Sequence, residues 1–277
     1  MIVVPHEDDE GRALPLLRST VIPAAFRHGF TTRAGGVSAP PYDTLNLGGK
    51  WGDAAENVAE NRRRVARAAG APLFVATQVH GAAIARVRAA DAPSGLAGVR
   101  ADGLCSDRRD VAVAVFVADC IPALVADPRT GACAAVHAGW RGTLAGVLPA
   151  AVRALHQHFG ARPEDLRVAL GPAIGPCCFE VGPEVVEAFE AGLPGARKAG
   201  VIVGATTAPG KPRIDLKRAN RLLLERAGVD PASIDAGDEC TSSDRERFYS
   251  FRRDRGATGQ HLGFIVAVGV TTSEGRY

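Results

Sequence analysis

The sequence predicts an α/β fold in which mixed β-sheets are flanked by helices. Apolar, β-branched runs of strand length alternate with longer amphipathic stretches along the whole chain. Glycine follows several of the amphipathic stretches, as it commonly follows helices. The chain has 277 residues, of which 46% are hydrophobic, and this is enough for a sizeable buried core. No internal repeat or long low-complexity tract divides it, so we expect a single domain over residues 1–277.

The elements of the first half follow from their ends and their apolar patterns. Residues 53–69 are expected to form a helix, because Asp53 can cap its start and Gly70 can end it. Strands are expected at 73–79 and at 111–117, where β-branched residues dominate.

The second half begins with a predicted hairpin, whose strands flank the turn at 127–131. A helix is expected at 143–159, and residues 167–175 are expected to form a strand that runs into a glycine loop. Two further helices are expected at 183–191 and 216–227, and Asp215 can cap the second of them. A closing strand is expected at 261–270. Surface loops are expected where glycine and proline gather, at 34–41, 93–98 and 204–212.

The composition argues against several classes of partner. The net charge is only +3, from 33 basic and 30 acidic residues, and aromatics make up 5%, so nucleic-acid binding is not expected. The most apolar window, 111–128, is broken by Asp119, Pro122 and Asp127, and therefore predicts strands and no membrane span. The start has no secretory pattern, and six cysteines form no regular framework. We therefore expect a cytoplasmic protein whose thiols are reduced.

A thiol and two imidazoles stand at predicted strand ends. If the hairpin centre lies near position 128.5, Cys120 and His137 are paired across its two strands. His80 follows the strand predicted at 73–79 and would supply a third ligand. Two imidazoles and one thiolate leave the fourth tetrahedral position of a zinc ion open, as in catalytic sites, and they also suit copper. The alternative is that the histidines are hydrogen-bonded in place and that the cysteine packs as a small hydrophobic residue.

Several motifs resemble those of one known family. They include "TQVHG" at 77–81, "ADG" at 101–103, "VADCIPALVADP" at 117–128, "AAVHAGWRG" at 134–142, "LGPAIGPCCFEVG" at 170–182 and "FYSFRRDRGATG" at 248–259, together with matching stretches at 28–48, 52–70 and 215–224. They occur in order over nearly the whole chain. On these motifs the chain resembles the laccase-domain family, whose members are also described as multicopper polyphenol oxidase-like proteins and as purine nucleoside phosphorylases.

The resemblance implies a fold, a metal and a reaction. The fold would be a layered sandwich similar to that of cytotoxic-necrotizing-factor-like cysteine hydrolases. The metal would be zinc, with copper as the alternative, bound by His80, Cys120 and His137. The reaction would be phosphorolysis of adenosine, inosine, guanosine or methylthioadenosine, with phosphate as co-substrate and with adenosine deamination as a second activity. The partners would be these small molecules, and no oligomeric state follows.

The same motifs indicate where the nucleoside and the phosphate would bind. Arg33, in a loop with two glycines, is the first candidate for phosphate, and Arg141 is the second. Asn46 and Gln78 can hydrogen-bond a ribose or a base edge, or they can hold their own loops. Asp119 can orient a histidine or carry a proton, and stabilisation of a turn is its alternative role. Cys177 and Cys178 are interpreted as a buried structural pair.

Two departures from the family pattern limit what is carried over. Cys240 is followed by Ser242 and Ser243 where the family often has a second cysteine, so a role for that thiol is not assigned here. Gln260 stands where the family has arginine, and no substrate role is assigned to it.

Two other functions use the same residues. A copper-dependent polyphenol oxidase is disfavoured, because a four-copper enzyme needs more ligands than the seven histidines provide. A cysteine hydrolase or peptidoglycan-editing protein would instead use Cys120 as a nucleophile with His137 as its base. Metal analysis of the purified protein would separate these alternatives.

Overall fold

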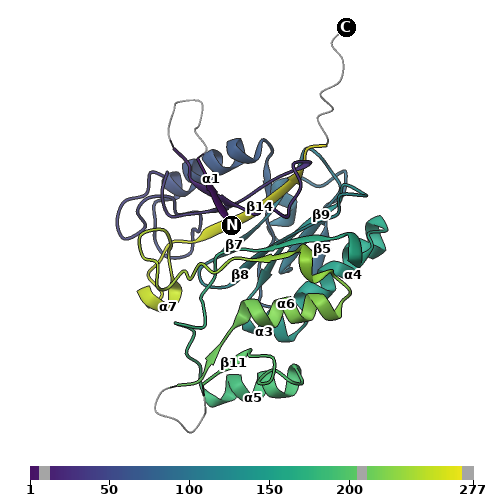
Figure 1. Ribbon diagram of the computed structural model, residues 1–277. Coiled ribbons are helices and arrows are strands. Elements are labelled where there is room, and N and C mark those ends of the chain that lie inside the picture. Colours follow the sequence, from purple (N-terminus) through teal and green to yellow (C-terminus); the bar gives the residue numbers. More distant parts are fainter. Residues whose placement is uncertain (6–12, 205–210, 270–277) are drawn as a thin grey trace.

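The protein contains two six-stranded mixed sheets, seen in the computed structural model, which describes residues 1–5, 13–204 and 211–269 (Figure 1). The first sheet has the order β1 (Ile2–Val4), β2 (Leu16–Arg18), β3 (Phe26–Thr31), β14 (His261–Ala267), β7 (Ala112–Val117) and β4 (Leu73–Phe74). The second has the order β13 (Ile234–Ala236), β10 (Arg167–Leu170), β8 (Ile121–Ala126), β9 (Cys133–Ala138), β6 (Gly103–Ser106) and β5 (Ile84–Arg86). Most neighbours are antiparallel, whereas β4 pairs with β7, β5 with β6 and β10 with β13 in parallel.

Helices cover the outer faces of both sheets, as Figure 1 shows. The helices of the described residues are α1 (Ala55–Ala69), α2 (Pro93–Leu96), α3 (Trp140–Leu144), α4 (Val147–Phe159), α5 (Pro183–Gly192), α6 (Leu216–Arg226) and α7 (Phe251–Asp254), with short 3-10 turns at Pro163–Asp165 and Pro231–Ser233. A small ladder of β11 (Ile202–Val203) and β12 (Arg213–Ile214) lies beside α5. None of these helices is both long and apolar enough to cross a membrane.

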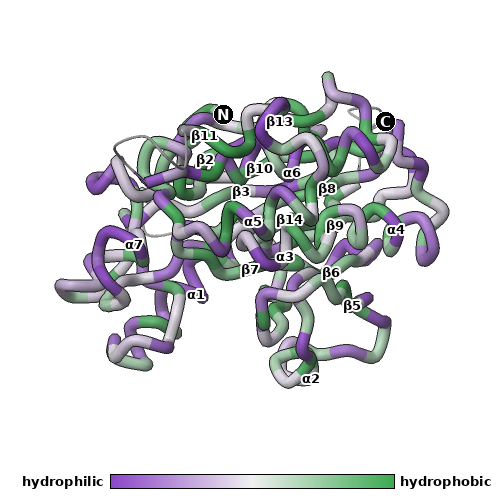
Figure 2. The backbone as a smooth tube through the Cα atoms, turned by 90° about the horizontal axis from the view of Figure 1, so that it is seen from below, coloured by the Kyte–Doolittle hydropathy of each residue, from purple (hydrophilic) through white to green (hydrophobic). Residues whose placement is uncertain are grey.

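The alternation of side chains along the strands explains the layers. In β7, Val113 and Val115 face the second sheet, where they share a buried cluster with Leu124. Their neighbours Ala112 and Ala114 face the opposite way, into a cluster with α1. The outer face of the second sheet packs in the same manner against α4, α5 and α6. The apolar strands therefore lie in the middle of the molecule (Figure 2), and the predicted layered α/β architecture with flanking helices is confirmed.

The sequence-based assignments were wrong in three places. A short helix, α2, occupies Pro93–Leu96, where a surface loop was expected at 93–98. The strand expected at 73–79 ends at Phe74, and Thr77 forms only an isolated bridge with Arg100. The helix expected at 143–159 is two helices, since the chain adopts a left-handed conformation at Gly146 between α3 and α4.

The caps also differ from expectation at one helix. Asp215 caps α6 as predicted, by accepting a hydrogen bond from the Arg218 N–H at 2.9 Å. Asp53 does not cap α1, because its carboxylate accepts from the Ser38 hydroxyl and the Asn46 amide. Part of the loop expected at 204–212 and the end of the strand expected at 261–270 lie outside the described residues.

Candidate metal centre and substrate pocket

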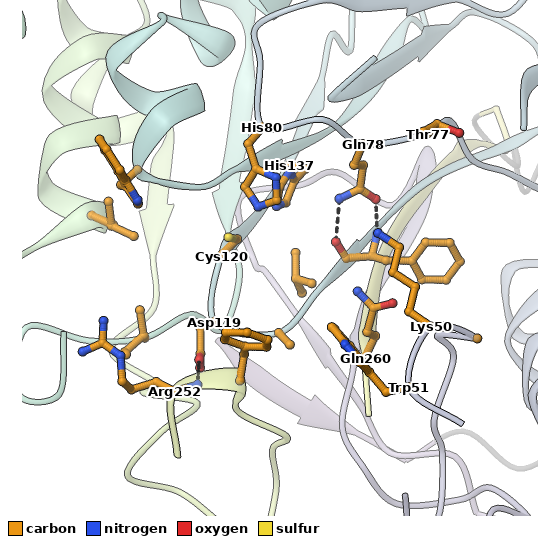
Figure 3. A pocket seen from close by; sticks show the side chains of 18 of the residues that line it. Lys50, Trp51, Thr77, Gln78, His80, Asp119, Cys120, His137, Arg252 and Gln260 are labelled. Carbon is orange, nitrogen blue, oxygen red and sulfur yellow. Dashed lines mark hydrogen bonds between the residues drawn. The ribbon is translucent and has the colours of Figure 1, made fainter. Parts of the chain in front are cut away.

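A cavity of about 540 Å³ opens between the ends of the two sheets (Figure 3). Its wall comes from the loop after β4, the segment that joins β7 to β8, the end of β9, and helix α7. Cavities of this volume are typical of small-molecule sites. Of the predicted site residues, the cavity is lined by Gln78, His80, Asp119, Cys120 and His137.

The three predicted metal ligands converge at one side of this cavity. The sulfur of Cys120 and one ring nitrogen each of His80 and His137 all lie within 4.8 Å of one another. His137 is buried, Cys120 is half-buried and His80 is exposed, so the cluster is open towards the cavity. This donor set matches that of catalytic zinc sites, which leave one coordination position free for water or substrate.

The predicted pairing of Cys120 with His137 was wrong by two positions. In the hairpin, Pro122 pairs with His137 and Ile121 with Ala138, and Cys120 precedes β8. The two ligands still meet, because both lie at the same end of the hairpin. His80 likewise does not end a strand. It lies in a loop, with a φ of 59° in the left-handed region.

A buried aspartate that the sequence reasoning had not singled out holds two of these ligands. Asp102 accepts a hydrogen bond from His137 Nδ1 at 2.9 Å, which leaves Nε2 to face the cluster. It also accepts from the backbone N–H groups of Val79, His80 and Gly81 at 3.2, 2.8 and 2.7 Å. The only signal in the sequence was the "ADG" motif itself. A carboxylate behind a ligating histidine fixes the ring orientation and raises its basicity.

The charges within the cluster are strongly coupled. Burial opposes the thiolate, but the neighbouring His137 and His80 imidazoles lower the pKa of Cys120 to about 6. Burial also opposes the imidazolium of His137, but Cys120 and Asp102 raise its pKa to about 9. The hydrogen bonds from His137 and the Gly81 N–H hold the pKa of Asp102 below its usual range, although burial acts in the opposite direction. The cluster therefore favours a thiolate at Cys120 beside a protonated His137, and the imidazole would release its proton when a metal ion binds.

The glycines of "HAGWRG" allow the chain to pack closely around the ligands. A Cβ atom at Gly139 would lie 2.9 Å from the Cys120 sulfur and 3.1 Å from a carbon of the His80 ring. A Cβ atom at Gly142 would lie 2.9 Å from the Gly81 carbonyl oxygen. These distances are shorter than normal contacts between a Cβ atom and another heavy atom, so the motif needs glycine at both positions.

The carboxylate of Asp119 faces away from the histidines. It accepts hydrogen bonds from the Thr241 hydroxyl at 2.6 Å, the Ser250 hydroxyl at 3.0 Å and the Arg252 N–H at 2.7 Å. These contacts anchor the start of α7 beside the predicted metal ligands, as Figure 3 shows for Arg252. They match the stabilising alternative, whereas the carboxylate that contacts His137 is that of Asp102.

Of the predicted substrate residues Gln78, Asn46 and Arg141, only Gln78 lines the cavity. Gln78 lines the cavity, and its amide pairs with both backbone groups of Phe116 at 2.7 and 2.8 Å. Asn46 is buried in its own loop, where its amide donates to the Gly48 carbonyl and accepts from the Gly48 N–H. Arg141 is exposed and lies over the Trp140 ring. Neither Asn46 nor Arg141 is among the residues that line the cavity.

Arg33 also lies outside the cavity lining. Its guanidinium forms an ion pair with Asp43 at 3.1 Å, donates to the backbone carbonyls of Asp43 and Arg245, and lies over the Tyr249 ring. These contacts join two distant loops. Its predicted phosphate contact therefore stays a prediction.

Aromatic and basic side chains that the sequence reasoning passed over complete the cavity. Trp51 and Phe251 form a tilted pair with ring centroids 5.9 Å apart, and Phe251 is 51% exposed. Lys50, Arg62 and Arg252 supply positive charge to the lining. The exposed Phe251 ring and the half-buried Trp51 ring, together with these basic groups, form a suitable surface for a flat, polar ligand that carries an anion.

The comparisons with known proteins identify the family of the chain. Residues 27–268 match the family described as "Multi-copper polyphenol oxidoreductase laccase". "Purine nucleoside phosphorylase PA4543" of Pseudomonas aeruginosa is 44% identical over 243 residues, which are 88% of this chain and 94% of that protein. "Purine nucleoside phosphorylase YlmD" of Geobacillus stearothermophilus is 40% identical over 247 residues, 86% of this chain and 88% of that protein.

A solved structure extends the agreement to the fold. The crystal structure of YlmD from Geobacillus stearothermophilus superposes with a TM-score of 0.81 at 35% identity, covering 96% of this chain and 99% of that chain. The family match and the two relatives each cover most of the sequence. The chain therefore belongs to the multi-copper polyphenol oxidoreductase laccase family.

Proposed function

We propose that this protein is a zinc-dependent purine nucleoside phosphorylase. Its substrates would be adenosine, inosine, guanosine and methylthioadenosine, and adenosine deamination would be a second activity. The main support is the convergence of His80, Cys120 and His137 on one side of a cavity of nucleoside size. The names of the relatives, purine nucleoside phosphorylases in two bacteria, support the same reaction.

The ligand set fits one zinc ion better than a group of copper ions. His80, Cys120 and His137 supply two imidazoles and a thiolate, and Asp102 supports His137 from behind. When bound, zinc would supply positive charge beside the substrate and polarise an oxygen close to it. Among the described residues, this is the one cluster of metal-binding groups that contains histidine. A multicopper oxidase needs several such clusters.

The reaction needs a base-binding surface and an anion site. In phosphorolysis the bond from C1′ of the ribose to the purine nitrogen breaks, a phosphate oxygen bonds to C1′, and the proton of the phosphate passes to the purine. Trp51 and Phe251 would stack on the purine. Lys50 and Arg252, which line the cavity, would attract the phosphate. Gln78, whose amide is fixed by Phe116, would keep that wall rigid.

The test is the product analysis of the purified protein with adenosine and phosphate. Adenine and ribose 1-phosphate should form, and chromatography and phosphorus NMR detect these two products. Inosine should form at the same rate with and without phosphate. Adenine release that persists undiminished without phosphate would indicate a hydrolase. Oxygen uptake with phenols and no nucleoside cleavage would indicate the oxidase alternative.

A pair of cysteine variants connects the reaction to the cluster. Cys120→Ala should remove the zinc ion of the His80–Cys120–His137 cluster and both products, because an alanine offers no ligand. Cys105→Ala, a matched change of a buried cysteine in β6, should keep them. A Cys120→Ala protein that retains full phosphorolysis would contradict the proposal. A metal-free wild-type protein that cleaves amides or esters through Cys120 would favour the cysteine hydrolase alternative.

A further inference from the structure

A second cluster of sulfur atoms lies near the cavity but is not part of its lining. The sulfur atoms of Cys177, Cys178 and Cys240 all lie within 4.8 Å of one another. Cys177 and Cys178 belong to the loop between β10 and α5, and Cys240 follows β13. Their interpretation as a buried structural pair was wrong, because Cys177 is exposed and Cys178 is half-buried. Cys240 is buried.

The backbone donates a hydrogen bond to the Cys240 sulfur. The donor is the Gly175 N–H, at 3.2 Å. A Cβ atom at Gly175 would lie 3.3 Å from the Cys177 sulfur and 3.4 Å from the Cys240 sulfur, so the backbone wraps closely around both. Backbone donors directed at sulfur are common around metal-bound thiolates, whose charge they stabilise.

A nearby cation would balance the charge of such a site. Lys217 is half-buried, and its side chain donates to the carbonyl of Glu239, the residue before Cys240. Three thiolates and a divalent ion together carry one negative charge, and Lys217 would compensate it.

We infer that Cys177, Cys178 and Cys240 form a second metal site, which binds a zinc ion through three thiolates. Three sulfurs at this spacing suit a soft or borderline ion, and they leave one coordination position for water. A disulfide would use two of the sulfurs and leave the third without a role. This inference does not depend on the proposed reaction.

The ion would join the Cys177–Cys178 loop, which forms part of the cavity wall, to the segment that contains Cys240. The backbone links between them are the bridge of Ala173 with Cys240 and the hydrogen bond from the Thr241 N–H to the Ala173 carbonyl at 3.0 Å. Ile174 and Phe179, on either side of the cysteine pair, line the cavity. The Ile174 N–H also donates to the Asp119 carbonyl at 2.9 Å, immediately before the ligand Cys120. The second site would therefore stabilise the cavity wall from outside.

Metal content in a set of variants of the full chain tests this inference. Reduced, metal-free protein is loaded with zinc chloride and freed of excess ions by gel filtration. The wild type and Cys105→Ala should each retain one more zinc ion per chain than Cys177→Ser. Cys120→Ala should keep the ion at the second site, and the double variant Cys120→Ala/Cys177→Ser should lose both. Cys177 is exposed, so its replacement by serine should leave the fold intact.

Cadmium provides an optical readout that is independent of catalysis. Cadmium added to the Cys120→Ala variant should produce the ultraviolet sulfur-to-metal charge-transfer band, and Cys120→Ala/Cys177→Ser should lose it. Zinc at about 100-fold over its dissociation constant should raise the Tm of Cys120→Ala by roughly 5 °C, but not that of the double variant. If Cys177→Ser retains as much zinc as the wild type, and Cys120→Ala gives no cadmium band, the second site does not exist.

Discussion

Asp102 Oδ1 lies 2.9 Å from His137 Nδ1, and this one contact sets which nitrogen of the histidine faces the cavity. The same carboxylate receives three consecutive backbone N–H groups from the loop of His80. Two of the three proposed ligands, which are 57 residues apart in the sequence, are thus oriented by one buried side chain.

Asp102→Asn should therefore weaken zinc binding by roughly 10- to 100-fold, the usual effect of removing a carboxylate behind a ligating histidine. Competition with a chromophoric chelator measures this affinity. Asp127→Asn is the matched control, because Asp127 is equally buried and holds the hairpin turn through Thr130. Equal zinc affinities in the two variants would show that Asp102 has no special role in the metal centre.

Gly139→Ala should lower the zinc affinity by roughly 10-fold without unfolding the protein. The added methyl group would press on the Cys120 sulfur at 2.9 Å and on the His80 ring at 3.1 Å, so the ligands would have to move apart. Gly95→Ala is the control, since no atom lies within 4 Å of its Cβ position. Chelator competition and circular dichroism together separate a ligand effect from a loss of fold. An unchanged affinity in Gly139→Ala would mean that the cluster tolerates the methyl group.

Phe251→Ala should raise the KM for adenosine by roughly 10-fold, within the range expected for the loss of one aromatic stacking contact with a base. Phe251 is 51% exposed and lies 5.9 Å from Trp51, so its ring is available to a ligand and contributes little to the core. The Tm should therefore hardly change. A stacking role also predicts that Phe251→Trp recovers most of the affinity. If the KM for adenosine is unaffected by Phe251→Ala, the base binds elsewhere in the cavity.

The phosphate site can be located by comparing Lys50 with Arg33. Lys50→Ala should raise the KM for phosphate roughly 10-fold, because it removes one charge-assisted contact from the cavity. Arg33→Ala should mainly lower stability, since the guanidinium holds Asp43 and the Arg245 carbonyl. Initial rates at varied phosphate and thermal denaturation measure the two effects. A raised phosphate KM in Arg33→Ala at unchanged Tm would restore the sequence-based assignment of Arg33.

The sequence was sufficient to name three residues that converge in the structure, but not to show how they are held in place. His80, Cys120 and His137 could be named because each belongs to a compact local motif. Asp102 could not, because its hydrogen bonds depend on how the β6 segment lies beside the His80 loop. The register of the hairpin was misjudged by two positions, since the turn was centred too early.

The fold class could be predicted from local sequence patterns. The boundaries of the helices and the residues that form the cavity wall depend on tertiary contacts. The β-branched run at 111–117 predicted a buried strand, and the two faces of β7 do pack in different layers. The break at Gly146 was missed, because a single glycine within a helical pattern is often tolerated. Trp51 and Phe251 meet from positions 200 residues apart, and nothing local in either segment indicates the other.

The stability of the protein should decline in mild acid because of His261. This residue lies at the start of β14, where its Nε2 accepts a hydrogen bond from the Tyr249 N–H at 2.8 Å. Burial, helped by the charge of Arg33, lowers its pKa from the ordinary 6.5 to about 3. In the unfolded chain the imidazole takes up a proton near pH 6.5, whereas in the folded protein it stays neutral until about pH 3.

The sign of the effect follows from this difference. The contribution of neutral His261 to the free energy of unfolding is complete above pH 6.5 and is lost as the pH falls towards 3, by up to about 1.4 kcal/mol per pH unit. Denaturant titrations at pH 7.5, 6, 5 and 4, values chosen to span roughly this window, should show the decline. His261→Gln, whose side-chain oxygen can also accept from Tyr249, does not titrate there and should decline less steeply. If the free energy of unfolding falls equally steeply with pH in the two proteins, His261 is not the group responsible. The acid sensitivity would then come from other groups such as His28, because burial also lowers the pKa of His28.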